Sequence, residues 1–401
     1  MYRLQCSLPA NKEPWNISLD ERCKIVSQAV KQGKKVTAML YHHADTSTFR
    51  YRCYNVYQAT KNSTKWQCVY FYMNEIDVLC KLLPQCNLLV LARLQWEHSV
   101  DCVIAKARSC GIPVLFDVDD LVWNLQYIRL ATNTLNVHFG GEADYNFWFS
   151  YISRMEFTAS MVDGFITTND FLGAKLSEKF GKPYQVIENA LNKEQLLVSE
   201  KCAKQKAKLK NQKPFTIGYF SGTPSHINDF KMIYQEMMQL LNDYPDMLLV
   251  VVGFMEFPDA MQPLIQKGRV VFKPLVDFLE LQRLIAEVDV SIVPLVENTF
   301  TNCKSELKFF EAAIVDTITI ATPNYTYAHA IEDQKTGFLC RPGQWYDQIS
   351  YIYNHPKESQ QIVKAAKEYC LQRYTGDVFL EQIHNAYDFF DKNDAVYSTN
   401  V

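Results

Sequence analysis

The segment from Asn302 to Ala313 reads NCKSELKFFEAA, and it follows closely on the apolar run Val288 to Pro294. It places two lysines and two glutamates around the start of a helix. Unpaired N–H groups and the helix dipole favour an anion there, so we interpret the segment as a candidate diphosphate site. An ordinary amphipathic helix, with Leu307 and Phe310 on its buried face, would show the same pattern.

Strands and helices alternate along the rest of the chain. In the first half, apolar runs predict strands at Lys35–Tyr41, Leu88–Ala92, Pro113–Phe116, Gly164–Thr168 and Tyr184–Ile187. In the second half, they predict strands at Thr216–Phe220, Met247–Val252, Val270–Phe272, Val288–Pro294, Thr317–Ala321 and Gly337–Leu339. Helical spacing predicts helices at Leu19–Gln32, Ser99–Cys110, Asp170–Phe180, Lys231–Tyr244, Val276–Ala286, Gly343–Tyr353, Pro356–Cys370 and Gly376–Lys392. This alternation indicates parallel sheets with helices on both faces.

A lysine-rich stretch divides the chain into two units of similar size. Residues 193–213 lose the helical periodicity and gain lysines. We interpret 196–213 as a solvated linker between a first domain, 1–195, and a second domain, 214–375. The long aromatic helix expected within 376–401 is predicted to pack back on the first domain.

The composition is that of an ordinary globular protein. The chain has 401 residues, of which 48% are hydrophobic and 21% charged, and a net charge of -3. This balance offers no basic field for nucleic acid. The 12 cysteines form no C-x-x-C pair and the start has no secretion signal, so we expect reduced thiols in the cytoplasm. No window reaches the roughly 18 apolar residues of a membrane span, so any membrane contact would be peripheral, at the inner face.

An arginine pair follows the first expected strand. The strand ends in the polar turn His42–Thr48, and Arg50 and Arg52 follow it on either side of Tyr51. Because α/β folds bind ligands beyond the carboxyl ends of their strands, the pair is a candidate anion clamp. The alternative is a helix start with solvated arginines.

Three aspartates follow the third expected strand. Asp119 and Asp120, just after Asp117, lie where α/β folds present side chains to a ligand. Carboxylates there can hold a metal, act as a base or accept sugar hydroxyls, whereas a helix cap would involve no chemistry. The aromatic segment Trp123–Tyr151, which contains His138, is interpreted as an insertion at the mouth of a cleft.

A turn of small residues follows the first strand of the second half. Gly222 and Thr223 allow the backbone to approach a ligand closely, although the pattern is neither G-x-G-x-x-G nor a Walker loop. His226 in this turn and His138 are secondary catalytic candidates. A lone histidine is more often packed or solvated.

Together these motifs resemble the retaining glycosyltransferase family 4 group. In the second half the matching stretches are IGYFSGTPSH (217–226), KSELKFFEAA (304–313), IATP (320–323) and GFL (337–339). In the first half TFRYR (48–52), FDVDDL (116–121) and VIENAL (186–191) are similar to a bacterial branch of that group found in polysaccharide assembly. The resemblance spans nearly the whole chain. It implies the α/β GT-B fold, with two Rossmann-like domains facing across a cleft and a C-terminal helix returning to the first.

The resemblance also implies roles for individual residues. Glu311 stands at the place of the family glutamate that grips the nucleotide ribose, whereas the family's sugar-contacting glutamate falls at Cys303. The expected donor site comprises Gly222, Thr223, Lys304, Ser305, Lys308 and Glu311. The expected catalytic residues are Asp119, Asp120, Lys308 and His226. The acceptor or anion candidates are Arg50, Arg52 and His138.

The activity implied is transfer of a sugar, with retention, from a nucleoside-diphosphate sugar to a glycan, lipid-linked or protein-linked acceptor. A UDP, GDP or dTDP sugar is the expected donor substrate, with no permanently bound cofactor and no need for a metal. Two alternatives stay open. One is a catalytically silent GT-B module that acts as a binding or assembly partner, and the other is a GT-B nucleotide-sugar epimerase.

Overall fold

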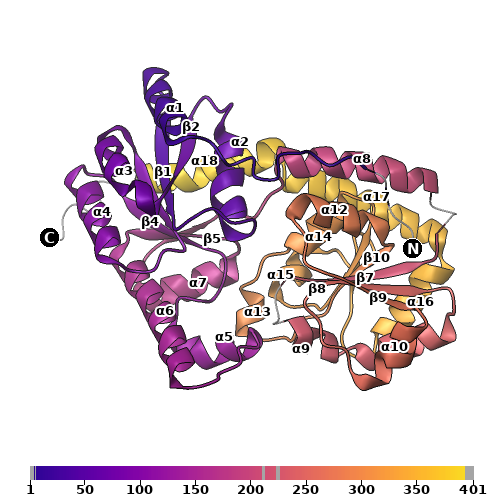
Figure 1. Ribbon diagram of the computed structural model, residues 1–401. Helices are drawn as coiled ribbons and strands as arrows, with labels where there is room; N and C mark the ends of the chain where they lie inside the picture. The colour runs from indigo at the N-terminus through magenta and orange to yellow at the C-terminus, as the bar shows by residue number, and fades with distance from the viewer. Residues whose placement is uncertain (1–3, 5, 210–212, 223–225, 393–401) are drawn as a thin grey trace.

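The computed structural model describes residues 4, 6–209, 213–222 and 226–392, and it shows two α/β halves side by side (Figure 1). Each half contains a six-stranded sheet. The strand order is β2-β1-β3-β4-β5-β6 in the first sheet and β12-β11-β10-β7-β8-β9 in the second. All neighbouring strands are parallel, as the alternation of strands and helices predicted.

In the first half the five predicted strands and three predicted helices are present, and β2, α2, α3, α5 and α6 are additional. The strands are β1 (Lys35–Tyr41), β2 (Trp66–Tyr72), β3 (Leu88–Ala92), β4 (Val114–Val118), β5 (Gly164–Thr167) and β6 (Tyr184–Val186). The α-helices are α1 (Leu19–Lys31), α2 (Asn55–Thr60), α3 (Ile76–Leu82), α4 (His98–Ser109), α5 (Ile128–Thr134), α6 (Glu142–Met161) and α7 (Asp170–Phe180). Shorter turns are the π-helix η1 (Arg50–Tyr54) and the 3-10 helices η2 (Met73–Glu75), η3 (Leu83–Gln85) and η4 (Leu125–Tyr127). The edge strand β2 was not expected.

The second half carries the remaining elements. Its strands are β7 (Thr216–Ser221), β8 (Leu248–Gly253), β9 (Val270–Lys273), β10 (Val290–Val293), β11 (Ile318–Ala321) and β12 (Phe338–Leu339). Its helices are α8 (Lys193–Leu209), α9 (His226–Lys231), α10 (Tyr234–Asp243), η5 (Asp259–Met261), α11 (Gln262–Gln266), α12 (Phe278–Glu287), α13 (Thr299–Asn302), α14 (Leu307–Ala313), α15 (Tyr325–Ala330), α16 (Trp345–Asn354), α17 (Pro356–Arg373) and α18 (Gly376–Lys392). The stretch expected to form one helix from about Asn302 is divided between α13 and α14.

The strands are buried on both faces of their sheets. Strands β3, β4, β10 and β11 are buried at every residue. They are therefore continuous apolar runs without the alternation of a one-sided sheet, as expected where helices cover both faces. A ligand site is consequently expected at the carboxyl ends of the strands, where loops and helix starts supply polar side chains.

The segment expected to be a linker forms the helix α8, which packs on α12. The buried side chains Val198 and Cys202 lie one helical turn apart on its inner face, and Lys206 continues this face one turn later. Lys206 Nζ donates to the carbonyl oxygens of Val288, at 2.7 Å, and Asp316, at 2.6 Å. These carbonyls follow the ends of α12 and α14, where a cation compensates unpaired carbonyls and the negative end of the dipole. A lysine-rich stretch is therefore helical here because one lysine is buried.

Three segments connect the two halves. Helix α18 returns to the first half, where the Trp66 indole N–H donates to Asp388 Oδ1 at 3.0 Å. We call residue 4 together with residues 6–17 the N-terminal strap (Figure 1). The strap crosses to the second half, where the backbone N–H of Leu4 donates to Glu287 Oε1 at 2.9 Å. The third segment, α13, is described with the site.

Among the described residues, no helix is both long and apolar enough to cross a bilayer.

Candidate active site

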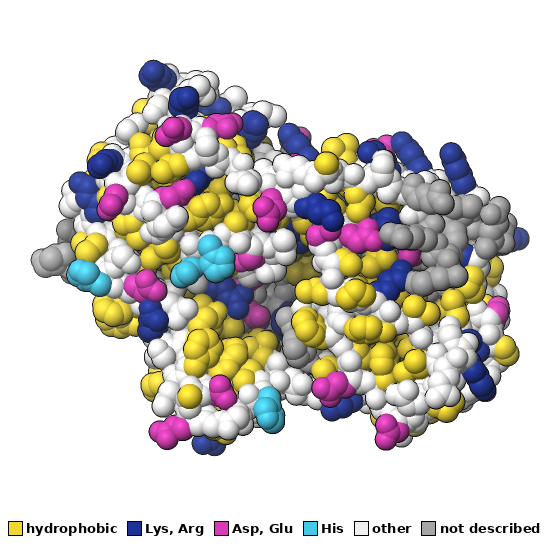
Figure 2. Space-filling view, viewed as in Figure 1, with side chains coloured by type: hydrophobic (Ala, Val, Ile, Leu, Met, Phe, Trp, Pro, Cys, Tyr) yellow, Lys and Arg dark blue, Asp and Glu magenta, His cyan; other side chains and the backbone are white. Residues whose placement is uncertain are grey.

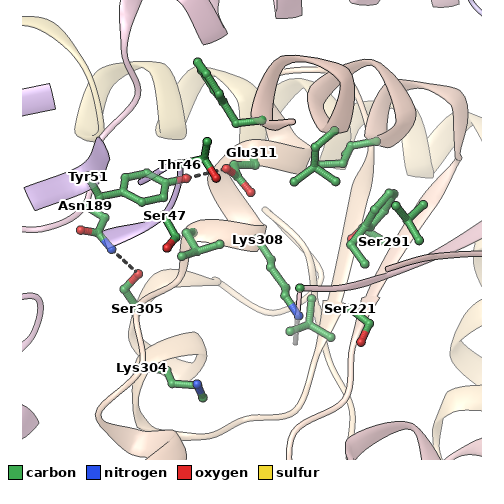
Figure 3. Close-up of a pocket in the computed structure, with 18 of the residues that line it drawn as sticks. Thr46, Ser47, Tyr51, Asn189, Ser221, Ser291, Lys304, Ser305, Lys308 and Glu311 are labelled. Carbon is green, nitrogen blue, oxygen red and sulfur yellow. Dashed lines mark hydrogen bonds between the residues drawn. The ribbon is translucent and has the colours of Figure 1, made fainter. Parts of the chain in front are cut away.

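A cavity of about 420 Å³ lies between the two halves of the molecule. The loops after β1 and β4 and the turn η1 form its first wall, and β7, β10, α12 and α14 form its second. Figure 2 shows acidic and basic side chains together in the hollow between the halves. Figure 3 shows Lys308 and Glu311 reaching into the cavity from α14, with Tyr51 and Asn189 approaching from the first half. The cavity therefore has charged and polar groups among apolar side chains.

The segment around α13 is held by side-chain amides. Asn298 caps α13 by accepting a hydrogen bond from the N–H of Thr301 at 2.9 Å. Asn324 Nδ2 donates to the carbonyl of Thr301 at 2.8 Å, and Asn302 Oδ1 accepts from the N–H of Tyr325 at 2.9 Å. Because these bonds tie the segment to α15, the polar residues that follow have a fixed position on the cavity wall.

Lys308 brings a partly buried cation into the cavity. Its Nζ lies 5.9 Å from the centroid of the Tyr219 ring. Burial lowers the pKa of Lys308 to about 8, and Asp229 opposes that shift. No carboxylate of the described residues forms an ion pair with its Nζ. Such a partly desolvated cation favours an anionic ligand, because the ligand would replace the solvation that the ammonium has lost.

Lys304 and Ser305, both expected in the donor site, lie on the same wall as Lys308. Lys304 Nζ lies 3.7 Å from Asp120 Oδ2, across the boundary between the halves. Ser305 Oγ accepts from Asn189 Nδ2 at 2.8 Å, also across this boundary. Gly222 lines the cavity at the end of β7. These contacts bring the predicted donor residues of the second half to the edge of the first.

Glu311 is a buried carboxylate that both halves share. Its Oε1 accepts from Tyr51 Oη at 2.5 Å and from Gln195 Nε2 at 3.2 Å, and it lies 3.7 Å from Arg50 Nη2. Burial raises the pKa of the Tyr51 phenol, which therefore remains a hydrogen-bond donor at working pH. All three contacts engage Oε1, and no hydrogen bond from the described residues reaches Oε2. The second oxygen is thus available to accept from a ligand hydroxyl.

The two predicted arginines occupy different places. Arg50 lines the cavity, and its Nη1 donates to Gln195 Oε1 at 2.7 Å. Arg52 does not line it: its guanidinium forms a two-point ion pair with the Asp117 carboxylate, at 2.8 and 3.0 Å, and also donates to the Ile187 carbonyl. Burial raises the pKa of Asp117, and Arg52 opposes the shift. The guanidinium of Arg52 is therefore engaged inside the first half, where it supports the loop below the cavity. Neither arginine is the solvated residue of the alternative interpretation, since both are buried.

The other two aspartates reach the cavity from the loop after β4. Asp119 Oδ2 accepts from Thr48 Oγ1 at 3.0 Å, and its Oδ1 accepts from Arg93 Nη1 at 3.0 Å. Asp120 faces Lys304 instead. Arg93 adopts a positive φ of 47°, which is uncommon for a residue with a side chain. The chain accepts this backbone strain directly beyond β3, beside a carboxylate of the cavity, and strain of this kind is frequent at functional sites.

Cys303 faces away from the cavity. It is fully buried and packs with Phe300 into the core of the first half, although α13 belongs by sequence to the second. Burial raises the pKa of its thiol. The position at which the family resemblance would place a sugar-contacting carboxylate is therefore used for packing between the halves.

Of the predicted site residues whose side chains the structure describes, Arg52 and His138 do not line the cavity. His138 is exposed in the loop between α5 and α6 and does not line the cavity. Thr223 lies outside the described residues, and so does the side chain of His226. Conversely, Tyr51, Gln195, Asn189 and Arg93 were not predicted. Only Tyr51, between the two arginines, stood beside a candidate in the sequence.

Comparison with known proteins finds a family match in the second half and similar folds for the whole chain. Residues 214–355 match the family model described as Glycosyl transferases group 1. No curated protein matches the sequence. Two parallel sheets with a cavity between them define the GT-B class of α/β proteins, so the chain has the GT-B fold and resembles GT-B glycosyltransferases, as expected.

Solved structures with this fold include enzymes of several bacteria. HepE of Anabaena in complex with UDP has 12% identity and a TM-score of 0.60, with 88% of this chain and 100% of that chain covered. A glycosyltransferase from Rickettsia africae has 13% identity and a TM-score of 0.59, with 90% and 99% covered. Sucrose-phosphate synthase from Thermosynechococcus elongatus has 15% identity and a TM-score of 0.57, with 89% and 99% covered. These similarities show the fold that the chain shares with these proteins.

Proposed function

We propose that this protein is a retaining glycosyltransferase of the family 4 type, which moves a hexosyl unit from a nucleoside-diphosphate sugar to a glycan, lipid-linked or protein-linked acceptor. The observation that carries the proposal is the partly buried Lys308 ammonium in the cavity lining, with which no carboxylate of the described residues forms an ion pair. The family match over residues 214–355 supports placing the donor in the second half. The domain limits 1–195 and 214–375, with 376–401 returning to the first domain, are part of the proposal.

In this proposal the diphosphate binds between Lys308 and Lys304. Lys308 meets its charge inside the cavity and Lys304 at the boundary with the first domain. Glu311 accepts hydroxyl protons of the ribose with its Oε2. HepE, which shares the fold, was solved in complex with UDP, and this supports a uridine nucleotide as the first donor to test. Charge stabilisation of the leaving diphosphate is the main catalytic requirement of this site, and the two lysines supply it.

The acceptor is proposed to enter from the first domain. Asp119 and Asp120 reach the cavity from that side and orient the attacking hydroxyl, with Arg50 holding the Glu311 region in place. The hydroxyl attacks on the face from which the diphosphate departs, which gives retention. Arg52, whose guanidinium is engaged with Asp117, has a supporting role in this scheme.

Isothermal titration with UDP, GDP and dTDP, followed by product analysis with the matching sugar donors, tests the proposal. We expect one nucleotide to bind and its sugar to appear on an added oligosaccharide with unchanged anomeric configuration. Conversion of the donor sugar without an acceptor would indicate an epimerase. Nucleotide binding without any turnover would indicate the silent module, and failure of all three nucleotides to bind would contradict the proposal.

A further inference from the structure

A second cavity, of about 450 Å³, lies between the halves at a different place from the first. Its walls come from the ends of β5 and β6, from α15 and from the junction of α17 and α18. No described residue lines both cavities. The segment from Lys304 to Leu307 separates them, because Lys304, Ser305 and Leu307 line the first and Glu306 lines the second. Nothing in the proposed reaction uses this second space.

A buried carboxyl group forms part of its wall. Glu306 is 4% exposed and stands beside Glu188. Burial, together with the charge of Glu188, raises the pKa of Glu306 to about 8. The group is therefore mainly protonated at neutral pH and offers both a hydrogen-bond donor and an acceptor. A protonated carboxyl suits an uncharged polar ligand better than a phosphate.

A second polar group in the wall is unsatisfied. Thr168 lines the cavity and is 1% exposed, and its hydroxyl has no hydrogen-bond partner among the described residues. A buried hydroxyl without a partner costs about 1–3 kcal/mol. A ligand hydroxyl placed against this wall would relieve that cost. The Thr168 observation is independent of the protonation of Glu306.

The guanidinium in the wall is already paired. Glu188 Oε1 accepts from Arg373 Nη2 at 2.7 Å, and its Oε2 accepts from Gln382 Nε2 at 2.8 Å. Arg373 is thus occupied and offers no free positive charge for an anion. Tyr325 supplies a partly exposed ring, whose centroid lies 4.2 Å from that of His329. Aromatic rings beside carboxyl, hydroxyl and imidazole groups offer an apolar face and hydrogen-bonding partners. A sugar ring has matching features, because it carries both an apolar face and hydroxyl groups.

We propose that this second cavity binds an uncharged saccharide unit, seated between Tyr325 and the wall formed by Thr168 and Glu306. The unit is either a free sugar or one residue of a longer glycan. The site is separate from the nucleotide cavity, so the proposal does not depend on the reaction proposed above.

Saturation-transfer NMR of the full chain tests the proposal, with glucose, mannose, N-acetylglucosamine, maltose and maltotetraose as probes. We expect at least one of these saccharides to bind in the millimolar range. Binding of a monosaccharide but not of maltotetraose identifies a free sugar as the occupant. Binding of maltotetraose but not of a monosaccharide identifies a glycan. Both results support the proposal, and absence of binding by all five probes overturns it.

Four variants place the bound probe. Thr168→Val preserves side-chain volume and Glu306→Leu removes the carboxyl group. Both should weaken saccharide binding at least tenfold, whereas Glu306→Gln should restore most of it. Thr168→Val should bind UDP like the unmodified chain, which shows that it is folded. Lys308→Met should lose UDP binding but keep saccharide binding. Loss of saccharide binding in Lys308→Met, or its survival in both Thr168→Val and Glu306→Leu, would overturn the proposal.

Discussion

Replacement of Lys308 tests the charge of the nucleotide cavity. Lys308→Met should weaken UDP binding about 10- to 100-fold, because a hydrogen bond to a buried charge contributes about 1.5–3 kcal/mol. Burial lowers the pKa of this lysine to about 8, so the free protein loses the cation as the pH rises through that value. UDP affinity measured by calorimetry should therefore fall between pH 7 and pH 9.5.

The matched control is Lys308→Arg, because arginine keeps its charge over this range. It should bind UDP with a flatter dependence on pH. Glu306, whose pKa is also raised to about 8, lies on the adjoining segment and titrates in the same window. If UDP affinity decreases with pH in the arginine variant as it does in the unmodified chain, the decrease arises from titration of Glu306 and not of Lys308.

The hydrogen bond between Tyr51 and Glu311 gives a second prediction. Tyr51→Phe removes one of the contacts that fix Oε1 of the carboxylate. Loss of a hydrogen bond of about 1 kcal/mol should raise the KM for the donor about fivefold, with a smaller effect on kcat. Tyr54→Phe is the control, since Tyr54 bonds to Glu194 and does not line the cavity. Equal effects of the two variants would show that Tyr51 acts only through stability.

At the scale of one element, α8 depends on a buried lysine. Lys206→Met keeps the length of the side chain but removes the ammonium that donates to the Val288 and Asp316 carbonyls. We expect the free energy of unfolding in urea to fall by about 1–3 kcal/mol. Lys204→Met, which removes only an exposed pair with Glu200, should change it by less than about 1 kcal/mol. Similar losses in both variants would contradict the role of Lys206.

Elements with a strong local pattern were predictable from the sequence, and elements that depend on distant partners were not. Strands β1 and β3 have the predicted bounds, because uninterrupted apolar runs are typical of a parallel sheet. Helix α8 was missed, because the burial of Lys206 depends on carbonyls about 80 to 110 residues away along the chain. In the site, Lys304, Lys308 and Glu311 line the cavity as local spacing indicated. The partners Tyr51 and Gln195 could not be found without the packing of the two halves.

At the scale of the whole molecule, the N-terminal strap joins both halves through Trp15. Its ring packs against Phe49 and Tyr54 in the first half and against Phe278 in the second, with centroids 5.7 to 6.0 Å apart. Trp15→Ala should lower the free energy of unfolding by about 3–5 kcal/mol. It should also speed hydrogen exchange in α12, on the far side of the contact.

The half-exposed Trp148 on α6 provides the control for the strap. Trp148→Ala should have a much smaller effect on unfolding and none on hydrogen exchange in α12. Unchanged exchange in α12 for Trp15→Ala would show that the ring stabilises the first half alone.

Phe300 and Cys303 precede the lysines of the cavity wall, yet they are embedded in the core of the opposite half. An opening motion that separated the two halves would expose both side chains to water. The exposure of the phenylalanine alone would cost about 1.5–3 kcal/mol. The cavity wall that contains Lys304 and Lys308 is thus anchored in both halves. Loading and unloading of the cavity are therefore expected to proceed by small movements at its rim, with the overall shape of the molecule preserved through the turnover cycle.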